Sequence, residues 1–110
     1  ARCAEKLHDH GKFLKVILET AYLSKEEIEA GCHICKDAGA DFVKTSTGFA
    51  HEGAKVENIK IMRAALPSSV GIKAAGGIKD LETAVAMIKA GADRIGTSSG
   101  VAILEEARAL

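Results

Sequence analysis

The stretch AGADFVKTSTG, residues 38–48, returns later in the chain as AGADRIGTSSG, residues 90–100. In each copy an aspartate precedes a short run that ends in a Thr, Ser and Gly turn, which predicts a strand followed by a loop. The second copy has Gly96 at the position where the first has Lys44. The fold therefore does not need a lysine there. Because a buried ammonium without a partner is costly, Lys44 needs a functional explanation.

Apolar runs and helical patterns alternate along the whole chain. Strands are predicted at residues 13–20, 41–47, 70–78 and 93–100, and helices at 24–39, 56–66, 81–90 and 101–110. Strands and helices that alternate over short connections are typical of parallel βαβ units and of the α/β class. The repeat, two βα units apart, favours a barrel over an open sheet, although an open sheet is not excluded.

Four strands are half of the eight that a closed β/α barrel requires. The predicted fold is therefore α/β with parallel strands, a single (βα)₄ half-barrel over residues 1–110, and its sheet is expected to have two exposed edges. Residues 1–11 have the composition of the end of a helix that Gly11 caps, so more chain is expected before them. Ser24 and Glu27 have the spacing of a capping box for the next helix.

Composition excludes several classes of function. The chain has 47% hydrophobic and 27% charged residues and a net charge of zero, so nothing attracts it to nucleic acid or to an anionic membrane. Aromatic residues make up only 4%, which leaves few side chains to stack on bases. No apolar run approaches the roughly 20 residues that a membrane span requires. We therefore expect neither nucleic acid nor a membrane as a partner.

The three cysteines are Cys3, Cys32 and Cys35. An odd number of cysteines is typical of a reducing compartment, so a cytoplasmic location is expected. Cys32 and Cys35 have the C-x-x-C spacing that metal sites and redox pairs use, but they lie within a helical pattern and the chain has no second pair. We interpret them as small apolar residues of the helix, and expect no metal.

Strand alternation brings charged residues together at one end of the sheet. The sets that share a face are Lys15, Ile17 and Glu19, then Phe42, Lys44 and Ser46, then Gly71, Lys73 and Ala75. Each lysine lies near the C-terminal end of its strand, where β/α barrels have their active sites. Neighbouring strands are about 4.8 Å apart, so Lys44 and Lys73 are predicted to be close neighbours.

An apolar setting and a nearby cation both lower the pKa of a lysine from its usual value of about 10.4. A neutral amine attacks carbonyl carbon and forms an imine, which is the functional hypothesis for Lys44. The alternative for Lys15 and Lys73 is that their ammonium groups reach the solvent at the rim.

Small residues follow the last two strands. Gly76 and Gly77 come just before one predicted helix, and Ser98 and Ser99 open the last one. Free N–H groups at helix starts bind phosphate when small residues allow a close approach. Lys79 is placed to add a cation at the rim. The alternative is that both turns are simple connections.

The stretches GADFVKTSTGF, VGIKAAGGI and GADRIGTSSGV, with LKVILET before them, resemble the deoxyribose-phosphate aldolase family. The likeness covers nearly the whole chain and corresponds to the second half of such an enzyme, its fifth to eighth βα units. The resemblance implies a class I aldolase on a TIM barrel that uses no metal and no cofactor.

The resemblance also implies roles for individual residues. Lys44 matches the Schiff-base lysine, and Lys73 matches the second lysine that activates it. The positions that match the substrate 5-phosphate site are Gly48, Gly76, Gly77, Gly96, Ser98 and Ser99, with Lys15, Thr47 and Lys79 as supporting residues. Lys79 stands where some relatives carry an arginine, and Phe49 where some carry a lysine, so phosphate contacts at the rim are expected to differ.

The implied reaction is the reversible cleavage of 2-deoxy-D-ribose 5-phosphate into glyceraldehyde 3-phosphate and acetaldehyde, a carbon–carbon lyase reaction of deoxyribose phosphate catabolism. The catalytic aspartate and the C-terminal tail of the family are expected outside these 110 residues. The expected partners are a small sugar phosphate and an aldehyde, with a homo-oligomer or the other half-barrel completing the sheet. The alternatives are an inactive half-barrel that assembles or binds phosphate without turnover, and another sugar-phosphate (βα)₈ lyase.

Overall fold

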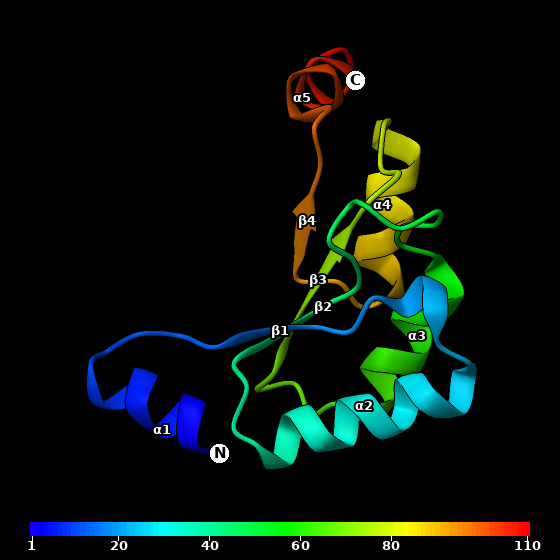
Figure 1. Cartoon of the computed structure of the whole chain (residues 1–110). Coiled ribbons are helices and arrows are strands. Elements are labelled where there is room, and N and C mark those ends of the chain that lie inside the picture. The colour runs from blue at the N-terminus through cyan, green and yellow to red at the C-terminus, as the bar shows by residue number, and fades with distance from the viewer.

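The computed structural model describes all residues from 1 to 110, and its helices and strands alternate as the sequence predicts (Figure 1). In chain order the elements are α1 (Arg2–Asp9), β1 (Lys15–Ile17), a 3₁₀ turn η1 (Thr20–Tyr22), α2 (Lys25–Asp37), β2 (Phe42–Lys44), α3 (Val56–Ala65), β3 (Gly71–Ala75), α4 (Leu81–Ala90), β4 (Arg94–Gly96) and α5 (Gly100–Arg108).

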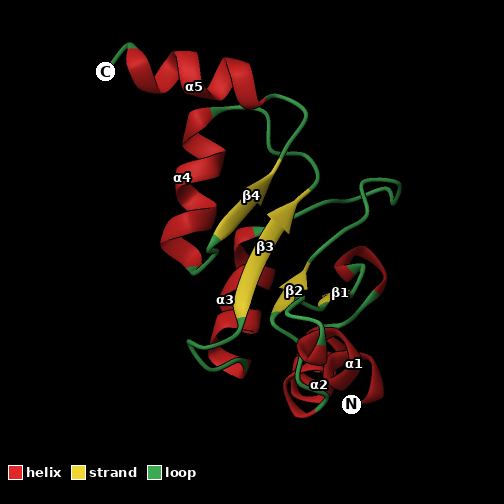
Figure 2. Ribbon diagram, turned by 90° about the vertical axis from the view of Figure 1, so that its left-hand side faces the viewer, coloured by secondary structure: helices red, strands yellow, loops and turns green.

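The four strands form one parallel sheet in the order β1-β2-β3-β4, so β1 and β4 are its edges (Figure 2). The register aligns Ile17 with Lys44, Lys44 with Lys73, and Lys73 with Arg94. Residues paired in this way project from the same face, so the predicted adjacency of Lys44 and Lys73 is confirmed. The predicted α/β class with parallel strands is also confirmed.

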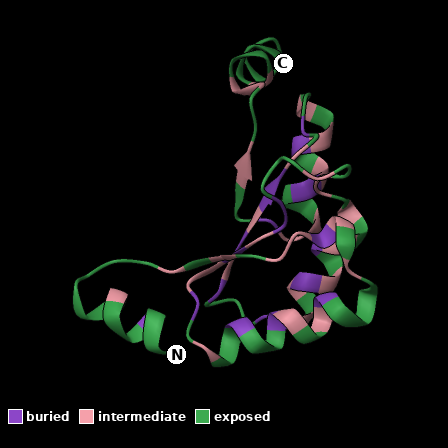
Figure 3. Ribbon diagram, in the orientation of Figure 1, coloured by how far each residue is buried: buried purple, intermediate pink, exposed green.

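The hydrophobic core lies between one face of this sheet and helices α2, α3 and α4 (Figure 3). Its largest fully buried apolar side chains are Ile28, Ile59, Met62, Ile72, Val43 and Cys32. Each large one stabilises the fold by about 1.5–3 kcal/mol relative to exposure. The opposite face, which carries Lys44 and Lys73, has no helix over it. The two lysines that the sequence predicts as catalytic therefore lie on the open face.

Cys32 and Cys35 are free thiols inside this core, as the helical interpretation predicts. Burial, followed by the proximity of Cys35, raises the pKa of Cys32 to about 11, and burial also raises the pKa of Cys35. Thiols that stay protonated at neutral pH are poor nucleophiles and poor metal ligands. None of the helices has the length and apolar character needed to cross a membrane.

The repeated Gly-Ala-Asp sequence has a structural explanation. Leu14 donates its N–H to the carboxylate of Asp41 at 2.7 Å, and Ile72 donates its N–H to that of Asp93 at 2.9 Å. Each aspartate thus ties the start of its own strand to a neighbouring strand. The Leu14 N–H, and then the hydrogen bond from His8, lower the pKa of Asp41 below its usual range.

All four predicted strands are too long; the third ends at Ala75 rather than at residue 78, and the fourth ends at Gly96 rather than at residue 100. The first strand ends at Ile17 rather than at residue 20, because Glu19 takes a left-handed conformation, with φ of 57°, and the chain turns into η1. The second strand ends at Lys44, where the Thr45 hydroxyl takes over pairing by donating to the carbonyl of Ala75 and accepting its N–H. The predicted role of Gly11 is confirmed: it has a φ of 67° just after α1, and the N–H groups of Gly11 and Lys12 donate to the carbonyls of His8 and Leu7. The predicted capping box of Ser24 and Glu27 is confirmed.

Candidate active site

A pocket of about 420 Å³ opens at the C-terminal ends of β2, β3 and β4. Its lining comes from the ends of these strands and the loops that follow them: Lys44, Thr47, Gly48, Ala75, Gly76, Gly77, Ile78, Lys79, Gly96, Thr97 and Ser98. The sequence predicts all of these as site residues except Ala75, Ile78 and Thr97. Segments far apart in the chain thus meet in one pocket with Lys44.

Free hydrogen-bond donors line this pocket. The backbone N–H groups of Gly48, Gly77 and Ser98 donate to no acceptor within the chain. Gly76 and Gly77 have φ values of 91° and 73°, which glycine adopts without steric cost, so the turn after β3 is tight. The three residues with free N–H groups, which line one pocket with Lys79, make up a cradle suited to an oxyanion such as phosphate.

The Thr97 hydroxyl fastens two of the loops together. It donates to the carbonyl of Ile78, in the loop after β3, and accepts the N–H of Ser99 at 2.9 Å. Ser99, which the sequence predicts as a phosphate ligand, lies outside the pocket lining, and its N–H is already bonded to Thr97. The sequence missed Thr97 because its role depends on a loop 19 residues away.

The loop between β2 and α3 packs on the glycine turn. Ala54 donates its N–H to the carbonyl of Gly76 at 3.0 Å. A Cβ added to Gly53 would lie 2.3 Å from the carbonyl carbon of Gly76, so only glycine allows this approach. Gly53 could not be recognised from the sequence, because its constraint comes from Gly76 in another loop.

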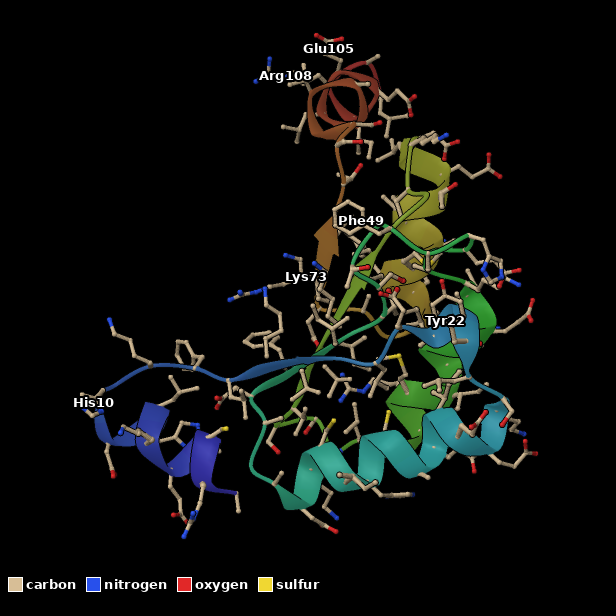
Figure 4. The ribbon with its side chains drawn as sticks, viewed as in Figure 1. His10, Tyr22, Phe49, Lys73, Glu105 and Arg108 are labelled. Carbon is tan, nitrogen blue, oxygen red and sulfur yellow. The ribbon has the colours of Figure 1, made fainter.

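Lys73 lies outside the pocket lining, beside Lys44 on the open face of the sheet (Figure 4). Its side chain runs along Gly96, where an added Cβ would lie 3.0 Å from Lys73 Cε. The charge of Lys15 is the largest cause of a lowered pKa at Lys73, followed by burial, Lys44 and Arg94. The three lysines predicted from strand parity therefore gather on one face, with Lys15 exposed at the edge strand.

Strand alternation does not describe Ser46 and Glu19, which lie beyond the observed ends of β2 and β1. Ser46 is fully buried and donates to the Thr45 hydroxyl at 3.1 Å, so it is not on the open face with Lys44. Glu19 turns to Thr47, whose N–H it accepts at 3.1 Å. Thr47 lines the pocket, but its polar groups face this carboxylate.

Arg94 is a further cation that the sequence analysis missed. Its guanidinium carbon lies 4.3 Å from the centre of the Phe42 ring. That ring covers Gly71, where an added Cβ would lie 2.3 Å from it. The strand parity of Arg94 with Gly96 was visible in the sequence, but its place beside Lys73 follows only from the register.

The sequence model described as "DeoC/LacD family aldolase" matches residues 1–106 of this chain. The chain belongs to the DeoC/LacD aldolase family. Among curated proteins of this family, the deoxyribose-phosphate aldolase of Thermococcus gammatolerans is 57% identical over 101 residues, which are 92% of this chain and 45% of that protein. The corresponding enzyme of Caldanaerobacter subterraneus is 59% identical over 98 residues, or 88% of this chain and 42% of that protein.

Solved structures of aldolases superpose closely on this chain. The structure titled "QR15, an Aldolase" has a TM-score of 0.86 at 49% identity, over 96% of this chain and 50% of that one. The tetrameric deoxyribose phosphate aldolase of Aeropyrum pernix has a TM-score of 0.87 at 36% identity, over 96% and 46%. The chain thus spans about half the length of the relatives it matches, and its four βα units correspond to half of a TIM barrel.

Proposed function

We propose that these residues supply the Schiff-base lysine and the phosphate-binding wall of a deoxyribose-phosphate aldolase. The observation that supports this most directly is the position of Lys44, which lines the same pocket as three residues whose backbone N–H groups have no acceptor in the chain. An amine and an anion cradle in one pocket suit a substrate with a carbonyl at one end and a phosphate at the other.

The cradle orients the substrate. The phosphate of 2-deoxy-D-ribose 5-phosphate accepts hydrogen bonds from Gly48, Gly77 and Ser98, and Lys79 adds a positive charge at the rim. With the phosphate fixed, the aldehyde carbon at the other end of the open-chain sugar is presented to Lys44. Orientation of this kind can supply several kcal/mol of the barrier reduction.

The reaction then proceeds through an imine. The Lys44 amine adds to C1, and loss of water gives a protonated imine. As the C3 hydroxyl loses its proton, the C2–C3 bond breaks and its electron pair moves into the iminium. Glyceraldehyde 3-phosphate leaves, and an enamine remains on Lys44. Protonation of the enamine carbon and hydrolysis of the imine release acetaldehyde and regenerate the amine.

Lys73 is proposed as the lysine that assists Lys44. The two are register partners on adjacent strands, so their side chains project side by side. The lowered pKa of Lys73 gives it a larger neutral fraction than an ordinary lysine has at the same pH, which suits proton exchange beside the reacting amine.

Completion of the barrel is part of the proposal. The unpaired edges of β1 and β4 fit pairing with the other half of a β/α barrel, or with a second copy in a homo-oligomer. We further propose a reducing cytoplasm as the compartment, since the three cysteines are all free thiols.

Borohydride trapping tests the role of Lys44. In a barrel that joins residues 1–110 to the first half of the T. gammatolerans relative, acetaldehyde and borohydride should leave an N-ethyl group on Lys44, located by peptide mass spectrometry. Lys44→Ala should lose both the adduct and turnover, whereas Lys60→Arg, at an exposed lysine of α3, should keep both. An adduct on another lysine, or none, would refute the proposed nucleophile.

Two rivals are separated by the same material. Another sugar-phosphate aldolase would form the Lys44 adduct but cleave a different phosphorylated sugar in a substrate panel. A half-barrel that only binds phosphate would bind it without adduct or cleavage. The family match, which spans aldolases of both DeoC and LacD type, favours the first rival over the second.

A further inference from the structure

Glu19 is the only non-glycine residue of the chain with a left-handed backbone, at φ 57° and ψ 64°. Side chains other than glycine pay a steric penalty there, so the conformation persists only when the surroundings hold it. Glu19 lies between the end of β1 at Ile17 and the start of η1 at Thr20. Backbone pairing continues around it, since Thr20 donates its N–H to the carbonyl of Thr45 at 2.9 Å.

The carboxylate of Glu19 accepts hydrogen bonds from one residue, Thr47. The Thr47 N–H lies 3.1 Å from Oε1 and 3.3 Å from Oε2, and the Thr47 hydroxyl also donates to Oε2. These bonds join positions 28 residues apart. Hydrogen bonds to an ionised acceptor are shorter and stronger than bonds between neutral groups.

These bonds also fix the direction of the Thr47 hydroxyl. Because its proton points to Glu19, its lone pairs are free for the N–H of Phe49, which donates to it at 3.2 Å. A side-chain oxygen that accepts the N–H two residues later closes a tight turn. Gly48 is the residue inside this turn. It has a φ of 101°, it lines the pocket, and its N–H has no acceptor within the chain.

From this geometry we infer that Glu19 is a positioning residue, which acts through Thr47 to hold the 47–49 turn and so aims the Gly48 N–H into the phosphate cradle. This inference rests on the proposed phosphate site and adds a residue to it. Glu19 does not bind the phosphate itself, because two anions repel each other. Its contribution is to fix the donor on the neighbouring turn.

The sign of a mutational effect separates this role from a simple charge effect. Removal of a carboxylate beside an anion site should strengthen phosphate binding if charge alone acts. Loss of positioning should weaken binding instead. Glu19→Gln distinguishes the two further, since the amide loses the charge but keeps an oxygen that can accept from Thr47.

The experiment is a titration of the 110-residue chain with inorganic phosphate, followed through the amide NMR shifts of Gly48, Gly77 and Ser98. We expect the wild-type amides to shift together. Glu19→Ala and Glu19→Gly should both weaken binding by about tenfold, the loss that corresponds to one well-placed hydrogen bond. Glu19→Gln should stay within about threefold of wild type.

The matched control is Glu27→Ala. Glu27 is also a carboxylate that accepts a backbone N–H, that of Ser24 at 2.8 Å, but it does so in the capping box of α2. This variant should lower the melting temperature and leave phosphate binding unchanged. It therefore measures what a loss of stability alone does to the titration.

Unchanged or tighter phosphate binding in Glu19→Ala would overturn the inference, as would wild-type behaviour of Glu19→Gly, since glycine removes the strain but not the need for the carboxylate. A wild-type chain that does not bind phosphate would overturn it as well. The borohydride experiment is independent. A missing Lys44 adduct with intact phosphate binding would refute the proposed reaction and leave the role of Glu19 standing.

Discussion

At the scale of single residues, the open face of the sheet is a cluster of cations with little to neutralise them. The cluster consists of Lys15, Lys44, Lys73 and Arg94, and the other three cations lower the pKa of Lys73. The sequence located three of these residues through strand parity alone. Lys15, rather than Lys44, has the largest effect on the pKa of Lys73. This order depends on where the flexible side chains lie, which strand parity does not specify.

Removal of the Lys15 charge should raise the pKa of Lys73. A nearby positive charge disfavours the ammonium form, so Lys15→Met stabilises that form and reduces the neutral fraction of Lys73 at any given pH. An NMR pH titration of the Lys73 ¹³Cε signal would measure this. Lys25→Met, at an exposed position of α2, serves as the control and should leave the titration unchanged. An unmoved or lower pKa in Lys15→Met would show that Lys15 does not act on Lys73.

At the scale of elements, the aspartates of the two Gly-Ala-Asp copies both join neighbouring strands, but they have different side-chain partners. Asp41 is joined by His8 at 2.8 Å, and Asp93 by Arg63 at 3.1 Å. Arg63 has more acceptors than His8: it also donates to the carbonyls of Pro67 at 2.7 Å and of Val70 at 2.8 Å. One side chain of α3 thereby fastens the loop that leads into β3 and the start of β4.

Arg63→Met should destabilise the fold by about 2–3 kcal/mol, because it leaves the Pro67 and Val70 carbonyls and the Asp93 carboxylate without their shared donor. Arg63→Lys should recover only part of this, since an ammonium lacks the planar fork that reaches several fixed acceptors. Urea denaturation would measure both. Lys60→Met, one turn earlier on α3 and exposed, should change the free energy of unfolding by less than about 0.5 kcal/mol. An equal loss in both methionine variants would contradict the anchor role.

At the scale of the whole molecule, the sheet has exposed apolar side chains at one edge as well as a charged face. Phe13 is 74% exposed and Ile17 43% exposed, beside the free edge of β1. An unpaired edge with apolar neighbours is a surface that another strand can extend. The family relatives are about twice as long as this chain, and the half of them that it does not match is suited to cover this edge.

The chain should therefore form a one-to-one complex with a separately produced first half of the T. gammatolerans relative, detected by light scattering. Ile17→Glu should weaken this complex, because it places a charge where an apolar side chain would be covered. Ile88→Glu is the matched control, since Ile88 is 55% exposed on α4 rather than beside the edge of β1, and should have no effect. Two components that never co-elute, or an equal response to both substitutions, would argue against pairing at this face.

The sequence by itself determined the features that depend on neighbours along the chain. These are the alternation of strands and helices, the capping box at Ser24 and the exceptional position of Lys44 at a strand end. Periodicity and capping act over a few residues, so they can be seen without coordinates. Residues near the strand ends were placed less well, because Glu19 and Ser46 leave the alternation where the strands stop.

Only the tertiary structure decided which distant groups meet. The bonds of Glu19 to Thr47, of Thr97 to Ile78 and of Arg63 to Asp93 each join separate βα units. Such contacts depend on strand register and on the path of the loops, which are fixed by packing of the whole sheet against its helices. The lysine and most residues of its pocket were therefore apparent in the sequence, whereas the hydrogen bonds that hold the surrounding loops were not.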